Sequence, residues 1–437
     1  MFSRRAILGA GAMAGMASPA AFATQVPASE FGVEPNVARD QSQALQKAVD
    51  AAAGRALFLP PGVYLAAGIE ITKPLGLSGV PGLTRIVTTG GTILTVRDAP
   101  SVTLSGLVLD GAANEASSEA PPVLAGLGAR DLAIEALAVR KGGGTGLDLR
   151  RCSGSIRHSS IAECGETAIF ALDCSGLEIV HNHVLDIANN GIQVWQSEAR
   201  EDGALVAFNR IERVAARSGG NGPYGNGINV YRAGNVTVSQ NRVSDCTFSA
   251  VRAHSASNVL ILANNCSRLD ETGLYVEFAF EGAVVADNIV ERAGNGISIT
   301  NFDQGGRLAA CTGNVVRDML GARSNPSTRA IGISVEADTA VTGNVVENAS
   351  HAGLWLGWGY AMRNIAATGN MVRNCGIGIA ASIAEKAEHG LIANNVISGS
   401  KTAAILGMDH SEAVTGDLAL PGATIPERLT VAGNLAT

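Results

Sequence analysis

The sequence has few aromatic residues, few charges and no long apolar run. Phe, Trp and Tyr together make up 4% of the 437 residues, and charged residues make up 16%. No segment reaches the ~20 consecutive apolar residues of a membrane-spanning helix. The formal net charge of −7 disfavours nucleic acid and anionic membrane surfaces. We therefore predict no nucleic-acid partner and no stable membrane insertion.

Cysteine is also scarce, with seven residues at irregular spacing. An odd number at such spacing does not predict a disulfide framework. The seven histidines show no zinc-site spacing either. Glycine, in contrast, is abundant, with 53 residues, and its strings have the pattern of turns between strands rather than of phosphate-binding loops.

The first 23 residues have the pattern of an export signal. Arg4 and Arg5 precede a short Ala/Gly-rich segment, and a small-x-small cleavage site ends at Ala23. The S-R-R-x-I-L core is similar to the signal that the twin-arginine translocation machinery recognises on folded proteins. Removing residues 1–23 takes away two arginines and no acid, so the net charge becomes −7 − 2 = −9. We expect a bacterial periplasmic or secreted protein whose partner during export is that machinery.

Beyond residue 100 a short pattern recurs along the chain. Two alternating apolar residues are followed by Asn three positions later, by an apolar residue two positions further, and then by a Gly-Ile-x-Val-type strand. The marker positions are Leu107, Leu137, Ser159, Asn182, Asn209, Asn241, Asn264, Asn288, Asn314, Asn344, Asn370 and Asn395. Their spacing varies between 22 and 32 residues, which is too unequal for a helical solenoid.

Short apolar runs of period 2, with loops free to lengthen between them, are typical of a parallel β-helix. We predict an all-β, right-handed, single-stranded parallel β-helix of about twelve coils that forms one domain over residues 24–437. Stacked coils lie ~4.8 Å apart. Asn suits the repeated corner because it tolerates left-handed backbone geometry and its amide can bond to the coils above and below.

Cysteine has a place in this repeat as a small buried residue. Five positions past the markers the residues are all apolar, and Cys164, Cys246 and Cys375 are among them. Cys266 falls on the other inward position. Free buried thiols are therefore favoured for most cysteines. For Cys152 and Cys174 the pattern leaves pairing open.

The two ends of the chain differ from the repeat. A helix is predicted from Asp40 to Gly54, within an N-terminal cap over residues 31–69, because its apolar side would cover the open end of the core. Residues 411–437 contain a polar insert and one last strand, which we expect to close the far end.

The N-terminal segment supports a family resemblance. The residues FG…D-x-x-x-A-L-Q-x-A-V-D-A-A…LFLPPGVY resemble the start of pectate-lyase-type β-helix proteins. Together with the export signal and the Asn-marked coils, they are similar to a family of twin-arginine-translocated repeat proteins of undefined activity. The resemblance implies the fold over nearly the whole chain. It does not imply one activity, because this fold carries lyases, hydrolases, epimerases and inert binders.

A candidate site follows from the Gly-Ile-x-Val strands, where such proteins usually bind ligands. Their alternate residues are predicted to point to solvent and to stack coil upon coil. The candidate catalytic residues are Tyr231, Arg252, His254, Tyr275 and Glu277. The candidate substrate-binding residues are Trp195, Asn229, Thr300, Asn301, Glu336 and Trp355. Four long loops are expected to border this cleft, at 196–203, 215–226, 301–307 and 320–329.

The residue types favour action on a polysaccharide or oligosaccharide and leave three alternatives. The first is lyase cleavage of a uronic-acid glycan, in which Arg252 binds the carboxylate and His254 or Tyr275 is the base. The second is hydrolysis by Glu277 with Glu336 or Asp270. The third is glycan binding without turnover. No cofactor is predicted, and calcium is not supported because the face has no Asp cluster.

Overall fold

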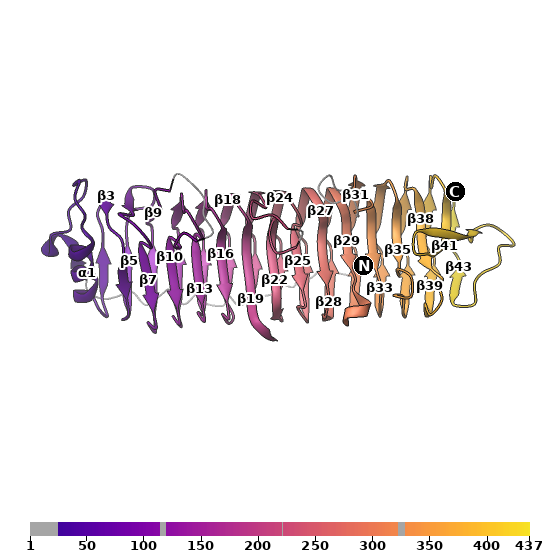
Figure 1. Ribbon diagram of the computed structural model, residues 1–437, viewed down its shortest axis with the longest axis horizontal. Helices are drawn as coiled ribbons and strands as arrows, with labels where there is room; N and C mark the ends of the chain where they lie inside the picture. Colours follow the sequence, from indigo (N-terminus) through magenta and orange to yellow (C-terminus); the bar gives the residue numbers. More distant parts are fainter. Residues whose placement is uncertain (1–24, 114–118, 221, 322–327) are drawn as a thin grey trace, which may run out of the picture.

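The computed structural model describes residues 25–113, 119–220, 222–321 and 328–437, so the predicted export signal lies outside the described residues. The chain forms a long stack of coils whose strands run across the long axis of the molecule (Figure 1). The helix α1 (Ser42–Ala51) lies at one end and β43 (Leu429–Ala432) lies at the other (Figure 1). Nearly every strand pairs in parallel with the equivalent strand of the next coil, which confirms the predicted parallel β-helix.

Three strand ladders run along the stack, and we number them in the order in which each coil passes through them. Ladder 1 is a 16-stranded sheet, and ladders 2 and 3 together form a 28-stranded sheet. Ladder 1 contains β1 (Gln25–Pro27), β2 (Ala56–Phe58), β5 (Leu75–Ser78), β8 (Val102–Ser105), β11 (Leu132–Glu135), β14 (Gly154–Arg157), β17 (Glu178–Val180), β20 (Leu205–Ala207), β23 (Thr237–Ser239), β26 (Val259–Leu262), β28 (Glu281–Ala286), β30 (Arg307–Thr312), β33 (Thr339–Thr342), β36 (Ile365–Thr368), β39 (Gly390–Ala393) and β43.

Ladder 2 contains β3 (Gly62–Leu65), β6 (Thr84–Val87), β9 (Val108–Asp110), β12 (Ala138–Arg140), β15 (Ser160–Ala162), β18 (His183–Ile187), β21 (Arg210–Val214), β24 (Arg242–Cys246), the first parts of β27 (Asn265–Glu277) and β29 (Ile289–Ile299), β31 (Val315–Met319), β34 (Val345–Ala349), β37 (Met371–Arg373), β40 (Val396–Ser398) and β44 (Leu435–Ala436). Ladder 3 contains β4 (Ile69–Ile71), β7 (Leu94–Arg97), β10 (Leu124–Leu127), β13 (Leu147–Arg150), β16 (Thr167–Leu172), β19 (Asn190–Glu201), β22 (Asn226–Gly234), β25 (Val251–His254), the second parts of β27 and β29, β32 (Ile331–Val335), β35 (Ala352–Leu356), β38 (Ile377–Ser382) and β41 (Ala403–Asp409).

The stack is longer than the about twelve coils that the Asn markers predicted. Ladder 1 alone has 16 strands. The difference arises because the first coils, such as the one that begins at β5, have no Asn marker and were not counted. Each additional coil extends one continuous hydrophobic core of Leu, Ile, Val, Ala and Cys side chains.

The Asn markers form a buried ladder at the corner between ladders 1 and 2. Asn264 Nδ2 donates to Asn288 Oδ1 at 3.0 Å and to the backbone oxygen of Val238 at 3.0 Å. The same pattern continues through Asn395 to Asn434, which the marker series had not included. The expectation that these Asn residues adopt left-handed geometry is wrong. The residue before each marker has the positive φ, as at His181 (58°) and Asp287 (58°), because the marker must turn its amide inward.

Both ends of the core are covered by a different element. At the N-terminal end α1 begins two residues later than predicted and ends at Ala51, and it buries Leu45, Ala48 and Val49 against the core. At the C-terminal end β42 (Glu412–Asp417) pairs antiparallel with β41. Among the residues that the model describes, no helix is long and apolar enough to cross a membrane.

The seven cysteines all lie in the described part of the chain, and all are buried and unpaired. Cys246 stacks between Val214 and Leu269 in ladder 2, as the apolar pattern predicted. Cys152 and Cys174 occupy neighbouring coils, and the backbone N–H of Cys152 donates to Cys174 Sγ at 3.4 Å. A side-chain hydrogen bond with Cys174 lowers the pKa of the Cys152 thiol to about 7.

Candidate functional site

The predicted stacking of the candidate residues on ladder 3 is confirmed. One column runs from Gln193 through Asn229, Arg252 and Tyr275 to Ser298. The neighbouring column contains Trp195, Tyr231, His254 and Glu277. Strand register therefore brings residues that are more than 80 positions apart onto one face.

The expectation that all these residues face solvent is wrong for Arg252, Glu277 and Asn229, which are buried. Arg252 Nε donates to Glu277 Oε1 at 2.6 Å, and its Nη1 donates to the backbone oxygen of Gly222 at 3.2 Å. Glu271 lies 3.7 Å from the same guanidinium. The loop between β21 and β22 folds over the face here, so that Arg252 is enclosed. A substrate carboxylate at Arg252 would compete with two glutamates.

Tyr275 is equally unsuited to act as a base. Burial raises the pKa of its phenol, and the guanidinium carbon of Arg252 lies 5.1 Å from its ring centroid. The phenol therefore stays protonated at neutral pH. Arg252, Tyr275 and Glu277 form a packed group beneath the loop.

Beside this group lies a continuous row of five rings, which we call the aromatic row: Phe170, Trp195, Tyr231, His254 and Phe278. The centroids of successive rings are 5.5, 5.4, 5.1 and 4.3 Å apart. Every ring is partly exposed. Asn229 is not open to a ligand, but its Oδ1 accepts a hydrogen bond from Trp195 Nε1 at 3.2 Å and so fixes that indole.

Three polar groups meet at the middle of the aromatic row. The guanidinium carbon of Arg232 lies 4.8 Å from the Tyr231 ring centroid, and the Tyr231 and His254 centroids are 5.1 Å apart. Burial lowers the pKa of His254, so its imidazole is neutral at neutral pH. Ser255 Oγ lies 3.0 Å from His254 Nδ1 and orients the ring. The site thus places a neutral imidazole, a phenol and an exposed cation together.

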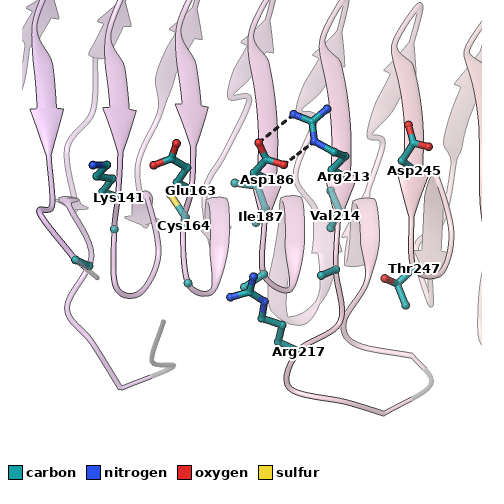
Figure 2. Close-up of a pocket in the computed structure, with 15 residues that line it drawn as sticks. Lys141, Glu163, Cys164, Asp186, Ile187, Arg213, Val214, Arg217, Asp245 and Thr247 are labelled. Atoms are coloured by element: carbon teal, nitrogen blue, oxygen red, sulfur yellow. Dashed lines mark hydrogen bonds and ion pairs between the residues drawn. The ribbon is translucent and has the colours of Figure 1, made fainter. Parts of the chain in front are cut away.

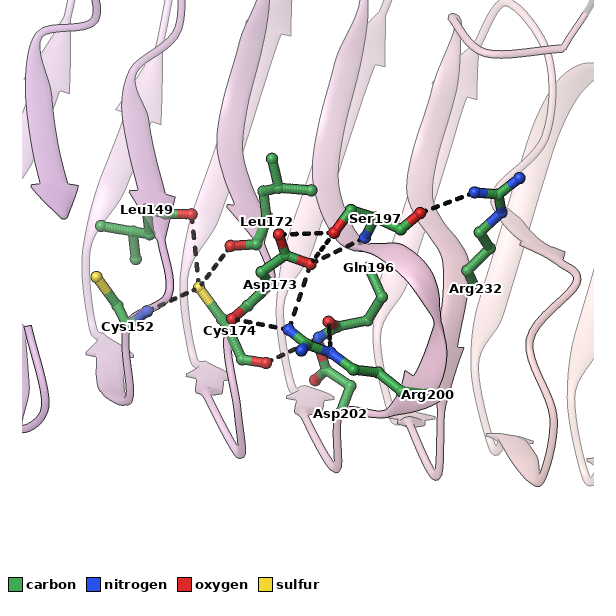
Figure 3. Close-up of polar contacts among 10 residues, drawn as sticks. All are labelled: Leu149, Cys152, Leu172, Asp173, Cys174, Gln196, Ser197, Arg200, Asp202 and Arg232. Carbon is green, nitrogen blue, oxygen red and sulfur yellow. Dashed lines mark hydrogen bonds and ion pairs between the residues drawn. The ribbon is translucent and has the colours of Figure 1, made fainter. Parts of the chain in front are cut away.

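The segment after Trp195, predicted as the loop 196–203, contacts Arg232 beside this row (Figure 3). Ser197 donates from N and Oγ to Asp173, at 2.9 and 2.7 Å. Arg232 Nη1 donates to the backbone oxygen of Ser197 at 2.8 Å. Figure 3 shows how these contacts join the segment to the coils before and after it. They hold Arg232 beside the row.

Glu336 lies farther along ladder 3, directly after β32. Burial raises the pKa of its carboxyl to about 7 from an ordinary value of 4.5. Glu336 Oε2 accepts a hydrogen bond from Phe302 N at 2.7 Å at the start of η2 (Phe302–Gln304). Asn301 is also used internally, because its Oδ1 accepts from Phe278 N at 3.2 Å. The hydroxyl oxygens of Thr300 and Ser298 are 3.3 Å apart.

Trp355 is not the solvent-facing platform that its position predicted, because only 3% of it is exposed. It packs in a second apolar cluster with Leu406 and Met408, against Trp358. The Trp355 and Trp358 centroids are 5.7 Å apart. Trp355 is therefore a core residue, whereas Trp358 remains partly exposed.

A groove runs along the corner between ladders 2 and 3, at the other end of the strands that carry the aromatic row (Figure 2). It measures about 620 Å³. Its charged lining residues are Lys141, Glu163, Asp186, Arg213, Arg217 and Asp245. Arg213 Nε donates to Asp186 Oδ1 at 2.6 Å, so part of this charge is satisfied internally. The lining contains three positive and three negative side chains, so its charge favours neither an anionic nor a cationic ligand.

The described residues also fail to supply a metal site. Among them, no group of three or more His, Cys, Asp or Glu side chains is placed to hold a metal ion.

Sequence reasoning missed Arg232 and Phe278, which follow the alternating strand positions directly. Both have positive φ, 56° and 60°, and this turn brings them back to the face. The signal that would have identified both residues is their position directly after the last outward-pointing residue of a strand.

The fold and this face define a parallel β-helix protein with an aromatic, partly charged strand face. The family model described as "Periplasmic copper-binding protein (NosD)" matches residues 213–411. Because the described residues supply no metal-ligand cluster, they do not fit copper. A search of the curated proteins finds no match.

Several solved structures share the fold. The N-terminal fragment of gene product 12 of bacteriophage phi29 matches with a TM-score of 0.55 at 14% identity, over 94% of this chain and 70% of that chain. A mannuronic acid specific polysaccharide family 6 lyase from human gut microbiota matches with a TM-score of 0.54 at 14% identity, over 94% and 91%. The A-module of the mannuronan C-5 epimerase AlgE6 from Azotobacter vinelandii matches with a TM-score of 0.50 at 16% identity, over 94% and 99%.

Proposed function

We propose that this protein is exported and binds an acidic polysaccharide along the aromatic row. The observation that carries the proposal is the row itself, in which five partly exposed rings continue across neighbouring coils with an arginine at the centre. Flat rings suit the apolar faces of sugar rings. A row along the stack suits an extended chain, because successive sugars meet equivalent positions.

Arg232 supports an acidic sugar. Its guanidinium is exposed, and its contacts among the described residues are with the Tyr231 ring and the Ser197 carbonyl. A guanidinium that pairs with no carboxylate among the described residues is suited to a bidentate contact with the carboxylate of a uronic acid. Arg232 takes the role that the sequence alone gave to Arg252.

The same three groups support cleavage by β-elimination. With the uronate carboxylate neutralised by Arg232, neutral His254 takes the proton from the carbon next to that carboxylate. The bond from the following carbon to the glycosidic oxygen breaks, a carbon–carbon double bond forms, and Tyr231 donates a proton to the leaving oxygen. The lowered pKa of His254 favours its neutral, proton-accepting form at neutral pH.

Hydrolysis is a second candidate because of Glu336. Its pKa of about 7 keeps a protonated carboxyl available near neutral pH, while Glu277 is paired with Arg252. The two carboxyls lie two coils apart, roughly 10 Å, which is at the upper limit for inversion. Lyase-type elimination remains the preferred proposal, since Tyr231 contacts both Arg232 and His254.

The test is incubation of the purified protein with a panel of uronic-acid polymers. Elimination gives an unsaturated product that absorbs in the ultraviolet, whereas hydrolysis gives new reducing ends without that absorbance. We expect unsaturated product from the wild type and a loss of about 100-fold or more in rate for His254→Gln. Arg242→Gln, an exposed arginine on ladder 2, is the matched control for Arg232→Gln. Binding without either product would contradict the elimination step and leave glycan binding alone.

A further inference from the structure

The outer face of ladder 1 changes character along the molecule. In the N-terminal half it carries charged residues such as Glu135, Arg157 and Glu178. From β26 to β43 the charged Glu281 and Arg307 are the first residues of β28 and β30 and lie at the edge of this face. None of the residues at the central outward positions is charged, and these positions form the uncharged face. These residues are Leu260, Leu262, Val284, Ala286, Ala310, Thr312, Ala340, Thr342, Ala366, Thr368, Leu391, Ala393, Thr430 and Ala432.

An exposed apolar stripe on ladder 2 continues this face. Directly after the Asn markers of the same coils come Ile289, Val315, Val345, Met371, Val396 and Leu435, which are between 36% and 58% exposed. Strand register stacks each of them on the next. In three coils the corner between face and stripe is low, because Gly313, Gly343 and Gly369 replace the larger corner residues of earlier coils. In the β28 coil the corner residue is the exposed Asp287, whose carboxylate lies against Gly313.

The size of this surface is that of a protein interface. Seven coils at ~4.8 Å give a length of about 30 Å, and four strand residues with the corner and the stripe give a width of about 25 Å. The product, on the order of 750 Å², is near the ~800 Å² that each partner buries in a standard interface.

Two lines of charge border the surface, and their order is regular. On one side Arg307 pairs with Glu281, and Arg363 Nη2 lies 2.5 Å from Asp338 Oδ2. On the other side Arg317 Nη2 lies 2.6 Å from Glu291 Oε2, and Arg373 Nη1 lies 3.5 Å from Glu347 Oε1. At these eight border positions both borders of one coil carry the same sign, and the sign alternates from coil to coil. The residues directly after Glu291 and Arg317 are Arg292 and Asp318, which carry the opposite sign. The four coils read Glu281 with Glu291, Arg307 with Arg317, Asp338 with Glu347, and Arg363 with Arg373.

This order distinguishes the two ways in which a second copy can cover the surface. In a parallel pair each coil faces its own equivalent, so glutamates meet glutamates and arginines meet arginines. In an antiparallel pair with its twofold axis between the Arg307 coil and the Asp338 coil, Arg317 faces the partner's Glu347 and Glu281 faces the partner's Arg363. All eight border positions are then complementary.

We propose that this face binds a second copy of the same chain in an antiparallel, twofold-symmetric dimer. The apolar residues of the uncharged face and the stripe supply the contact, and the charged borders fix the direction. An apolar centre with a polar rim is the usual anatomy of a protein interface. The aromatic row lies on ladder 3, outside this surface.

Sedimentation analysis of the purified protein tests the proposal. The wild type is expected to be a dimer, and Ala340→Glu is expected to raise its dissociation constant about tenfold or more by placing two carboxylates near the axis. Ala133→Glu is the matched control, because it makes the same change in the same column of ladder 1 in the charged half. A monomer at about 100 µM, or an equal effect of both variants, would overturn the proposal. Binding to lipid vesicles or to another protein, without self-association, would also overturn the proposal.

The direction of the pair has its own test. Arg317→Glu and Glu347→Arg are each expected to weaken the dimer about tenfold, and the double variant is expected to restore it to within about threefold. A spin label at Thr430→Cys gives the second readout. It lies three and a half coils from the axis, so the antiparallel pair predicts a label separation of about 34 Å. Labels in near contact, or no rescue by the double variant, would contradict the antiparallel arrangement.

Discussion

At the scale of single residues, the Asn ladder explains how a buried corner is made without unpaired backbone groups. Each amide oxygen accepts from the backbone and side-chain N–H groups of the Asn one coil before it, and each amide nitrogen donates to a carbonyl of that coil's ladder 1 strand. The corner is satisfied only when every member is present. Buried polar groups without partners are costly, so the ladder fixes the stacking of one coil on the next.

Removing one member of this ladder is therefore expected to be expensive. Asn288→Ala leaves the N–H of Asn264 and the carbonyl oxygen of Ile261 without their partners. We expect a loss of about 3 kcal/mol in the free energy of unfolding. Asn265→Ala, at an exposed neighbouring position, is the control and is expected to cost less than about 0.5 kcal/mol. Urea denaturation measures both, and equal losses would refute the role of the ladder.

Glu336 makes the stability depend on pH. Its pKa in the folded protein is about 7 and its ordinary value is 4.5, so the folded chain binds the proton more tightly. Stability from this group is complete below pH 4.5 and is lost as the pH rises through 7. The decline is at most about 3 kcal/mol. Denaturation at several pH values should show that Glu336→Gln removes the decline; an unchanged pH dependence would exclude this carboxyl as its source.

Single residues also show what sequence can reveal. The Gly-Ile-x-Val pattern predicted the register of the candidate site correctly, because Trp195, Tyr231 and His254 occupy the same position in it. The sequence could not predict the positive φ of the residue before each marker. Nor could it reveal that Arg252 would be buried, because burial depends on a loop whose path the repeat does not determine.

At the scale of elements, the loops decide which strand positions reach solvent. The segment between β21 and β22 reaches Arg252 through Gly222 and turns an outward position into a buried one. The turn after β27 does the opposite, since it returns Phe278 to the aromatic row. The strand pattern therefore determines which residues stack in columns, and the loops determine which residues of those columns reach the surface.

The buried pair beneath that loop gives a test at this scale. Glu277→Gln removes the carboxylate 2.6 Å from Arg252 Nε and leaves a buried cation short of one partner. We expect a loss of about 3 kcal/mol for this variant and for Arg252→Met, with a double variant that loses much less than their sum. A double-mutant cycle by urea denaturation measures the coupling. Additive losses would show that the two side chains act independently.

At the scale of the whole molecule, the stack separates its surfaces. The aromatic row occupies ladder 3 between Phe170 and Phe278, and the uncharged face occupies ladder 1 from β26 to β43. Each coil contacts mainly its two neighbours, so stability is nearly a sum of local terms. The length of the stack provides independent surfaces on one rigid support.

Such a stack should open from its ends. Amide hydrogen exchange is expected to be slowest in the central coils, around β22 to β29, and faster toward β2 and β43, because end coils have one neighbour less to lose. Exchange of the backbone in ladder 1 measures this directly. Uniform protection over the whole length would contradict a molecule held together by nearest-neighbour contacts.

The central claim is that an acidic glycan binds along the aromatic row, and calorimetric titration with uronic-acid oligomers tests it most directly. We predict that Trp195→Ala weakens binding about tenfold or more, because the indole is fixed in the row by Asn229. Trp358→Ala, in the other aromatic cluster, should leave the affinity unchanged. Equal losses in both variants, or unchanged affinity in Trp195→Ala, would contradict the assignment of the row as the binding surface.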